Sequence, residues 1–432
     1  MRFRSGAVSV SPTTPIPELR EAQLARVREL LRVVLPGNRF YNRKFNGVGA
    51  SDVRTLDDFR TLPFTLKAEL AADQTENPPY GSTLSFAFEK YSRLHQTSGT
   101  STGKPLRWLD TPESWEWLLG CWRVSFPFMG LTAGDIIFFP FSFGPFLGFW
   151  TAFEAASRAG YMCIPGGGMT STARLRFLIE HACTVVFATP TYALHLAELA
   201  AKEGIDLANG PVRAVVVAGE PGGNIPATRE RIETVWGARV FDHYGMTEIG
   251  PVAVESHDQR GHMYLLESEY LAEVLIPGTN TPAPAGEFGE LVVTNLGRTG
   301  SPLIRYRTGD LVRIATDSDP TGRTWRRLDG GILGRADDMI HVRGNNLYPA
   351  SIESIIRRFS EVAEYRIVVD HRGSLTDLRI EVEPVDGDGR ELAENVSRAV
   401  RDELLFRVDV SAVPCGSLPR FELKAKRLVH QR

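Results

Sequence analysis

The sequence predicts an α/β protein with a large N-terminal domain and a small C-terminal domain. Three observations lead to this prediction. Strand-like apolar runs alternate with helical patterns between Ile136 and Asp242, which is typical of a parallel sheet covered by helices on both faces. After Leu271, short strands and turn residues replace the alternation and indicate a smaller β region. The C-terminal part then has the pattern of a compact α+β unit.

The composition excludes several classes of protein. The chain has 432 residues, of which 43% are hydrophobic and 23% charged, so it suits large buried cores rather than a disordered, collagen-like or coiled-coil chain. A net charge of −3 gives no reason to expect a nucleic-acid partner. The four cysteines form no CxxC pair and the N-terminus lacks an apolar leader, so we expect a cytoplasmic protein. The sequence leaves a homodimer open.

The alternating part begins with an uncharged stretch over residues 136–153. Prolines and glycines between 140 and 148 would break a membrane-spanning helix, so no membrane partner is expected. We expect a strand over Ile136–Phe139, an aromatic loop, and a helix from Leu147. The elements expected next are strands over 160–164, 184–188, 212–218 and 239–242, and helices over 173–181, 192–203 and 225–235. The last two strands lead into Gly219–Gly223 and His243–Gly250, where ligands would collect at the strand ends.

The boundary between the domains is expected within 334–339, which gives domains over 1–336 and 337–432. Before it, strands are expected over 290–294 and 311–314, and Asp310 is expected in a turn that precedes the second strand. After it, the expected elements are helices over 350–359 and 392–405 and strands over 365–370, 378–382 and 407–412.

The strongest motif is TSGTSTGKP at residues 97–105. Its hydroxyls and unhindered backbone N–H groups can surround phosphate oxygens, with Lys104 as the closing charge. It is not a Walker A motif, because Pro105 stands where that motif has its metal-binding Ser or Thr. On composition alone, a flexible surface loop is the alternative. The candidate phosphate-binding residues are Thr97, Ser98, Gly99, Thr100, Ser101, Thr102, Gly103 and Lys104.

This motif resembles the phosphate loop of the adenylate-forming enzymes, which include acyl-CoA synthetases, luciferases and peptide-synthetase adenylation domains. Further motifs follow in the order of that superfamily: GEP at 219–221, YGMTE at 244–248, YRTGD at 306–310, GRADDMI at 334–340 and PRFELKAKR at 419–427. The GEP triplet and RGNNLYPASIE at 343–353 most resemble the phenylacetate–CoA ligase branch. The resemblance implies parallel sheets flanked by helices and a β subdomain in the large domain. It also implies a small mobile α+β domain that rotates at a hinge near Asp337.

The resemblance further implies a reaction that uses ATP, Mg²⁺ and CoA. The carboxylate of an acid attacks the α-phosphate of ATP, pyrophosphate leaves, and the acyl group then passes to CoA. Thr247 would bind the α-phosphate and Glu248 the Mg²⁺. Lys424, rather than Lys426, would be delivered by the small domain to neutralise charge during adenylation. The remaining nucleotide-binding residues would be Gly219, Glu220, Pro221, Asp242, His243, Tyr244, Gly245, Met246, Asp310 and Arg335, with Tyr244 beside the adenine, Gly219 and Glu220 beneath it, and Asp310 on the ribose hydroxyls.

The pocket for the acid is expected around Phe141, Phe143 and Phe146, together with Ala218, Tyr244 and Gly245. Aromatic walls suit a small aromatic acid, although core packing is the alternative for any single Phe. The sequence does not decide whether the acceptor is CoA or a carrier protein, an amine or a hydroxyl. A ligand-binding protein with a dead active site is disfavoured by the complete set of reactive residues.

No zinc is expected. Some members of the branch hold a structural zinc through a Cys and a His after the YGxTE motif and through a later Cys pair. Here Ser256 stands near the first Cys position and residues 317–324 contain no Cys. Because zinc needs about four N or S ligands, we expect His257 and His262 to be loop or packing residues.

Overall fold

The computed structural model of the chain describes residues 10–97, 105–336, 338, 340–342, 345–370, 377–421 and 425–431. The chain divides into two compact units, one of Met1–Gly168 with Phe241–Gly331 and the other of Met169–Val240 with Ile332–Arg432. This division differs from the boundary expected near residue 337, which stays a prediction. Within the described residues, no helix is both long and apolar enough to cross a membrane.

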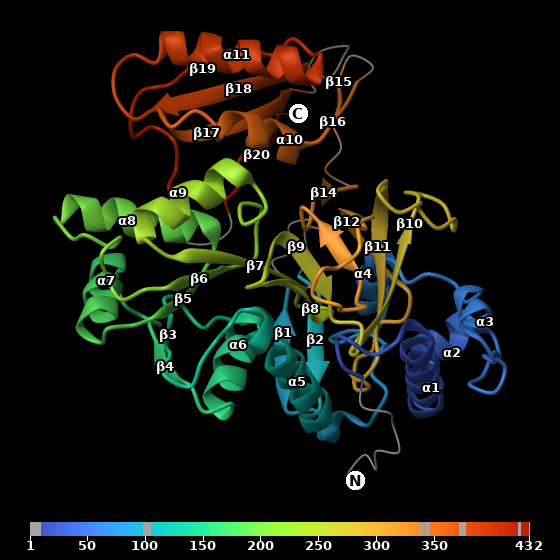
Figure 1. Cartoon of the computed structure of the whole chain (residues 1–432). Helices are drawn as coiled ribbons and strands as arrows, with labels where there is room; N and C mark the ends of the chain where they lie inside the picture. The colour runs from blue at the N-terminus through green and yellow to red at the C-terminus, as the bar shows by residue number, and fades with distance from the viewer. Residues whose placement is uncertain are drawn as a thin grey trace. The chain divides into compact units, whose positions relative to one another are not determined.

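Helices outnumber strands in the described N-terminal part of the first unit (Figure 1). They are α1 (Ile16–Val34), α2 (Arg39–Phe45), α3 (Leu56–Arg60), α4 (Lys67–Glu76), the 3₁₀ helix η1 (Phe88–Lys90), α5 (Pro112–Phe128) and α6 (Leu147–Arg158). The buried residues of α1 recur every three or four positions at its C-terminal end, as the apolar stripe of a surface helix should. The N-terminus of α5 is set by Thr111, whose side chain accepts from the Ser114 N–H, and by the following proline.

The strands described in the first unit fall into four groups. The hairpin β1 (Arg93–Gln96) and β2 (Arg107–Asp110) is antiparallel, and β3 (Ile136–Phe139) pairs in parallel with β4 (Met162–Pro165). An antiparallel series contains β7 (Arg239–Met246), β8 (Gly250–Ser256), β9 (Gln259–Leu265) and β13 (Arg327–Asp329). Another contains β10 (Tyr270–Leu275), β11 (Phe288–Asn295) and β12 (Tyr306–Arg313). The strand expected over 136–139 and the helix start expected at 147 are confirmed.

The second unit contains the rest of the alternating region. Its elements there are α7 (Ser171–Glu180), β5 (Val185–Ala188), α8 (Pro190–Lys202), β6 (Ala214–Val217) and α9 (Pro226–Trp236). The two strands pair in parallel and every residue in them is buried, which explains their unbroken apolar sequences. Helices α8 and α9 lie side by side (Figure 1). The predicted elements of this region are therefore confirmed to within a few residues.

The C-terminal part of the second unit is built on a four-stranded sheet. Its elements are β14 (Gly334–Arg335), β15 (Ile340–Val342), β16 (Asn345–Leu347), α10 (Pro349–Ile356), β17 (Val362–Asp370), β18 (Asp377–Pro384), α11 (Arg390–Leu404), β19 (Asp409–Ala412) and β20 (Leu428–Gln431). The sheet order is β19-β18-β17-β20, and only the central pair is antiparallel. Helix α11 packs on this sheet (Figure 1) through Ala393, Val396 and Val400. The predicted α/β architecture is thus observed.

Two expectations about the motif segments are wrong. The strand expected over 239–242 continues to Met246 and pairs with β8, so the HYGMTEIG segment is a β-hairpin rather than a loop after a strand. Strand β12 begins at Tyr306, so Asp310 lies inside a strand and not in a turn before one. Gly309 has φ +75° and permits the local distortion of this strand, and it resembles a turn residue in the sequence for the same reason. In both cases a neighbouring strand supplies the hydrogen bonds that the local sequence does not reveal.

Candidate active site

The β7–β8 hairpin and strand β12 bring the YGMTE and YRTGD motifs together. The hydroxyl of Tyr244 donates to Oδ2 of Asp310 at 2.5 Å, and the hydroxyl of Tyr306 donates to Oε1 of Glu248 at 3.2 Å. All four side chains are buried. The residues expected at the adenine, the ribose and the metal are therefore linked through two hydrogen bonds that run between the same two segments.

Gly245 allows the hairpin to close tightly. A Cβ at this position would lie 2.7 Å from the carbonyl oxygen of Gly250 and 3.1 Å from Cα of Pro251, both in the opposite strand. Because both obstacles are backbone atoms, a side chain here would force the strands apart. The glycine of YGMTE therefore has a steric reason in this fold, independent of any role in the acid pocket.

Lys67 contacts the expected metal carboxylate. Its Nζ lies 3.5 Å from Oε1 of Glu248, and it stands at the first position of α4. This residue was not predicted from the sequence. One signal was available, since only seven of the 49 basic residues are lysines. Lysine is a compact point charge, and here it lies beside a single buried carboxylate.

A buried ion pair supports the turn that carries Thr247 and Glu248. The guanidinium of Arg298 donates to both carboxylate oxygens of Asp110, at 2.7 and 2.6 Å, and both side chains are completely buried. Its Nη1 also donates to the carbonyl oxygen of Thr247 at 2.8 Å. Asp110 is the last residue of β2, so the pair connects the β1–β2 hairpin to the YGMTE turn. Sequence reasoning missed both residues.

The same hairpin carries the expected phosphate loop. At its base the backbone N–H of Thr97 donates to the carbonyl of Leu106, and the N–H of Leu106 donates to the Thr97 hydroxyl, both at 2.9 Å. Thr97 is buried. Residues 98–104, which include Ser98, Gly99, Lys104 and the other predicted phosphate ligands, lie outside the described residues. So do Asp337, the predicted hinge, and Lys424, the predicted catalytic lysine.

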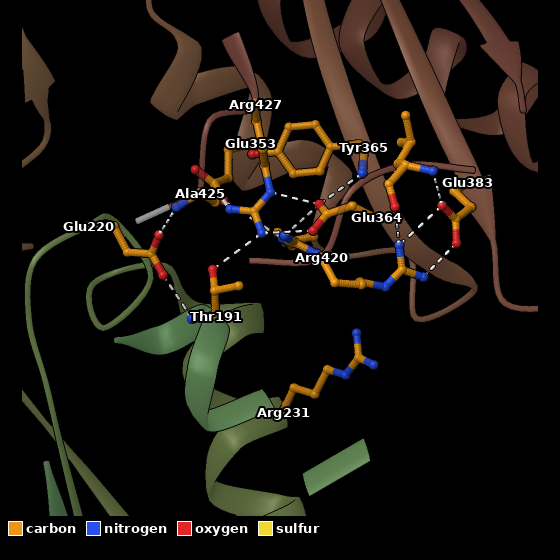
Figure 2. A network of polar contacts seen from close by, with 12 residues as sticks. Thr191, Glu220, Arg231, Glu353, Glu364, Tyr365, Glu383, Arg420, Ala425 and Arg427 are labelled. Atoms are coloured by element: carbon orange, nitrogen blue, oxygen red, sulfur yellow. Dashed lines mark hydrogen bonds and ion pairs between the residues drawn. The ribbon is translucent and has the colours of Figure 1, made fainter. Parts of the chain in front are cut away.

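The second unit holds the GEP motif. Ala218 follows β6, Gly219 has φ +95°, and Pro221 is exposed. The carboxylate of Glu220 accepts from the backbone N–H groups of Thr191 and Ala425, at 2.8 and 2.7 Å (Figure 2). Arg335 is half-buried in β14. The assignment of these residues to the nucleotide stays a prediction.

The residues that precede Tyr244 on β7 are also buried. The N–H of Asp242 donates to Oε2 of Glu255 at 3.0 Å, while the Asp242 carboxylate accepts from the N–H of His243 at 2.9 Å. The His243 ring stacks on Trp122, with centroids 4.2 Å apart, and its buried Nε2 has no hydrogen-bond partner among the described residues. Met246 is half-buried and Gly245 is exposed at the end of the strand.

Comparisons with known proteins identify the family to which this chain belongs. Residues 96–298 match the family model of AMP-binding enzymes, and residues 344–432 match the model of the AMP-binding enzyme C-terminal domain. The phenylacetate–coenzyme A ligase of Escherichia coli is 32% identical over 433 residues, which cover 97% of this chain and 96% of that protein. This chain belongs to that family. Its members are adenylate-forming acid–coenzyme A ligases, so the chain is an enzyme of this class.

Two further comparisons extend the match. The phenylacetate–coenzyme A ligase of Thermus thermophilus is also 32% identical, over 95% of this chain and 96% of that protein. A solved structure of 2-hydroxyisobutyryl-CoA ligase, in the postadenylation state with its acyl-adenylate, has a TM-score of 0.91 and 29% identity and covers 97% of this chain and 91% of that one. The adenylate-forming relationship and the predicted fold class are confirmed.

The aromatic residues expected to line the acid pocket pack against one another in this ligase. Phe141 stacks on Phe149 with ring centroids 4.2 Å apart and is buried. Phe143 contacts Trp150 at 5.0 Å, and Phe146 contacts Phe149 at 6.1 Å. Phe141 therefore has a clear packing role, whereas Phe143 and Phe146 remain half-buried at the loop between β3 and α6.

His257 and His262, the two histidines near the expected zinc positions of related enzymes, contact neighbouring protein groups. Nδ1 of His257 lies 3.2 Å from the carbonyl oxygen of Phe128, and Nδ1 of His262 lies 3.7 Å from the Asp329 carboxylate. Across the described part of the chain, no group of three or more His, Cys, Asp or Glu side chains is arranged to hold a metal ion. The absence of zinc in the enzyme stays a prediction.

Two buried histidines predict how stability depends on pH. Burial lowers the pKa of His243 from 6.5 to about 3, and burial is also the main reason that the pKa of His95 falls to about 4. Below pH 6.5 the unfolded chain therefore binds protons that the folded chain does not, so stability is lost as the pH falls from 6.5 towards these values. Each histidine contributes a slope of at most about 1.4 kcal/mol per pH unit.

The loss of stability is measured by urea unfolding at several pH values from about pH 7 to about pH 4.5, which roughly spans the range in which the histidines of the unfolded chain bind protons. His243→Phe keeps a ring that can stack on Trp122 and removes the titrating group. The free energy of unfolding of this variant should depend less steeply on pH than that of the wild type. An identical slope for the two proteins would contradict the assignment.

Proposed function

We propose that this enzyme activates a small aromatic carboxylic acid with ATP and transfers the acyl group to CoA. The observation that carries the proposal is the pairing of Tyr244 with Asp310 and of Tyr306 with Glu248, which gathers the nucleotide and metal motifs of the family in one buried cluster. The names of the phenylacetate–coenzyme A ligase relatives and the half-buried Phe143 and Phe146 support the aromatic substrate.

The proposed chemistry has two balanced steps. A carboxylate oxygen of the acid attacks the α-phosphorus of ATP, the bond from that phosphorus to the bridging oxygen breaks, and pyrophosphate leaves. The sulfur of CoA then attacks the acyl carbon, the bond to the phosphate oxygen breaks, and AMP leaves with the proton of the thiol released to solvent. The hydroxyl of Thr247 would stabilise the charge on the reacting α-phosphate by a hydrogen bond, and Lys424 would partly neutralise that charge.

Glu248 fits a magnesium ligand. It is a buried carboxylate, and one or two such hard oxygen ligands together with nucleotide phosphates are typical of a Mg²⁺ site. Mg²⁺ bound there would supply positive charge for the phosphates. Lys67 and Tyr306 would hold the carboxylate in place by contacts to Oε1 and would partly neutralise it. Asp310 would orient the ribose, and Tyr244 would orient Asp310.

The substrate class is tested by comparing kcat/KM for benzoates, arylacetates, 2-hydroxy acids and fatty acids in a pyrophosphate-release assay. An aromatic pocket gives a long chain no place to bind, and each unburied methylene forfeits about 0.8 kcal/mol. Aryl acids should therefore exceed a twelve-carbon fatty acid by roughly two orders of magnitude or more. A preference for fatty acids or for 2-hydroxy acids would contradict the aromatic substrate, and product masses with and without CoA identify the acceptor.

A pair of variants tests the walls of the pocket. Phe146→Ala should widen the site and raise kcat/KM for bulkier aryl acids relative to small ones, because Phe146 is half-buried at the loop. Phe141→Ala serves as the packing control, and it should lower the free energy of unfolding by about 3–5 kcal/mol, since this ring is buried against Phe149. If Phe146→Ala left the preference among aryl acids unchanged, Phe146 would not line the acid pocket.

A further inference from the structure

Glu220 joins two segments that are far apart in the sequence. Its Oε1 accepts from the backbone N–H of Thr191 at 2.8 Å, and its Oε2 accepts from the backbone N–H of Ala425 at 2.7 Å. Figure 2 shows the carboxylate between the start of α8 and the C-terminal tail. Both oxygens of the side chain are therefore engaged by backbone donors within the second unit.

The N-terminus of α8 fixes the carboxylate. Thr189 caps this helix by accepting from the Tyr192 N–H, which leaves the Thr191 N–H to find another acceptor. A carboxylate is favoured there because the first turn of a helix carries partial positive charge. With one oxygen bound to α8, Glu220 presents its other oxygen to the tail in a defined direction.

Two residues beyond Ala425, Arg427 attaches the tail to strand β17. Its Nε and Nη2 donate to the two carboxylate oxygens of Glu364, at 2.7 and 3.1 Å, and its carbonyl accepts from the Ile367 N–H at 2.7 Å. The Nη2 also reaches the Thr191 hydroxyl at 3.3 Å. The tail is thus held at Arg427 by the β17 sheet and at Ala425 by Glu220 (Figure 2).

We propose that Glu220 is a positioning residue for adenylation. By binding the N–H of Ala425 it holds the tail at the residue that directly follows Lys424 in the sequence, and the delivery of this lysine in the first half-reaction depends on that contact. The proposal rests on the function proposed above, in which Lys424 serves the first half-reaction. This role differs from the adenine contact expected for Glu220 from the sequence, because both of its carboxylate oxygens accept hydrogen bonds from backbone N–H groups.

Two substitutions remove the contact from opposite sides. Glu220→Gln keeps the size of the side chain but replaces one acceptor oxygen by an amide donor, so only one of the two N–H groups keeps its acceptor. Ala425→Pro removes the donor and leaves Glu220 intact, with Ala425→Gly as the control for altered backbone freedom. Glu383→Gln is a second control. Glu383 also accepts from backbone N–H groups, those of Gly416 and Leu418. In the described structure it makes no hydrogen bond to residues 425–427.

The experiment measures the two half-reactions separately, as pyrophosphate release from ATP with a benzoate or arylacetate, and as thioester formation from supplied acyl-adenylate and CoA. In Glu220→Gln and in Ala425→Pro, kcat of pyrophosphate release should fall by roughly 10- to 100-fold. The KM for ATP should be nearly unchanged, and the rate of thioester formation should stay within about twofold of the wild-type rate. The double variant should lose little more than either single variant. Glu383→Gln should change both half-reactions by the same factor.

Other results would overturn the proposal. A higher KM for ATP at unchanged kcat in Glu220→Gln would indicate an adenine contact, and equal loss of both half-reactions would indicate a general structural role. Normal pyrophosphate release by both variants would show that the contact has no part in adenylation. Failure of the proposed function is distinguishable, since the wild-type enzyme would then release no pyrophosphate with any acid of the panel.

Discussion

Lys424→Ala should release pyrophosphate at least about a hundredfold more slowly than the wild type, because it removes the positive charge that neutralises the carboxylate and the α-phosphate as they approach. Thioester formation from supplied acyl-adenylate should remain largely intact, since the role proposed for this lysine belongs to the first half-reaction only. The measurement is the rate of pyrophosphate release compared with the rate of thioester formation in the same preparation.

Lys426→Ala is the matched control for this prediction. Lys426 is exposed and lies two residues further along the same tail, so its loss should leave pyrophosphate release close to that of the wild type. If Lys426→Ala were inactive and Lys424→Ala nearly normal, the spacing argument would have identified the wrong lysine. Equal melting temperatures of the two variants would exclude a difference in folding.

Replacing Arg298 by Met should reduce both stability and adenylation. The change leaves Asp110 as an unpaired buried charge, and breaking a buried pair from one side costs about 3–5 kcal/mol. Since folded proteins are stable by about 5–15 kcal/mol, the variant should still fold at low temperature. It also deprives the Thr247 carbonyl of its donor, so pyrophosphate release should fall by roughly a hundredfold even when the protein is folded.

The double variant with Asp110→Leu separates these two effects. Two apolar side chains in place of the ion pair should restore much of the free energy of unfolding, because no buried charge remains. They supply no donor for Thr247, so pyrophosphate release should stay slow. Recovery of both stability and adenylation in the double variant would show that the pair is structural and does not position the YGMTE turn. Urea unfolding and the pyrophosphate assay, each measured at a temperature where both variants are folded, give the two quantities.

Local signals were sufficient to predict much of the second unit. The strand at 214–217 consists of buried apolar and mostly β-branched residues, and α8 and α9 each begin with a proline at the first helical position. These features depend on residues next to one another in the chain. The helices before residue 93 were not predicted, although the buried spacing in α1 was readable as a helical stripe.

The partners of the candidate site could not be predicted in the same way. The motif order grouped Tyr244, Glu248 and Asp310, but the hydrogen bonds that bring these residues together depend on contacts between distant segments. Arg298 stands in a polar, glycine-containing segment that has the composition of an exposed loop, yet it is completely buried because Asp110 neutralises it. A charged residue with a distant partner has no local signature of burial.

The paired contacts of β12 with the β7–β8 hairpin limit how this enzyme can change in length. Tyr244 and Glu248 are four residues apart, and so are their partners Asp310 and Tyr306, in the opposite direction along the chain. Deleting one residue between Tyr306 and Asp310 would turn the next side chain to the other face of β12. Deleting one residue between Tyr244 and Glu248 would shift Glu248 in the turn that follows β7, so either change on one segment alone would break the match. Sequence drift in this part of the site is therefore restricted to substitutions, or to insertions and deletions that occur on both segments together.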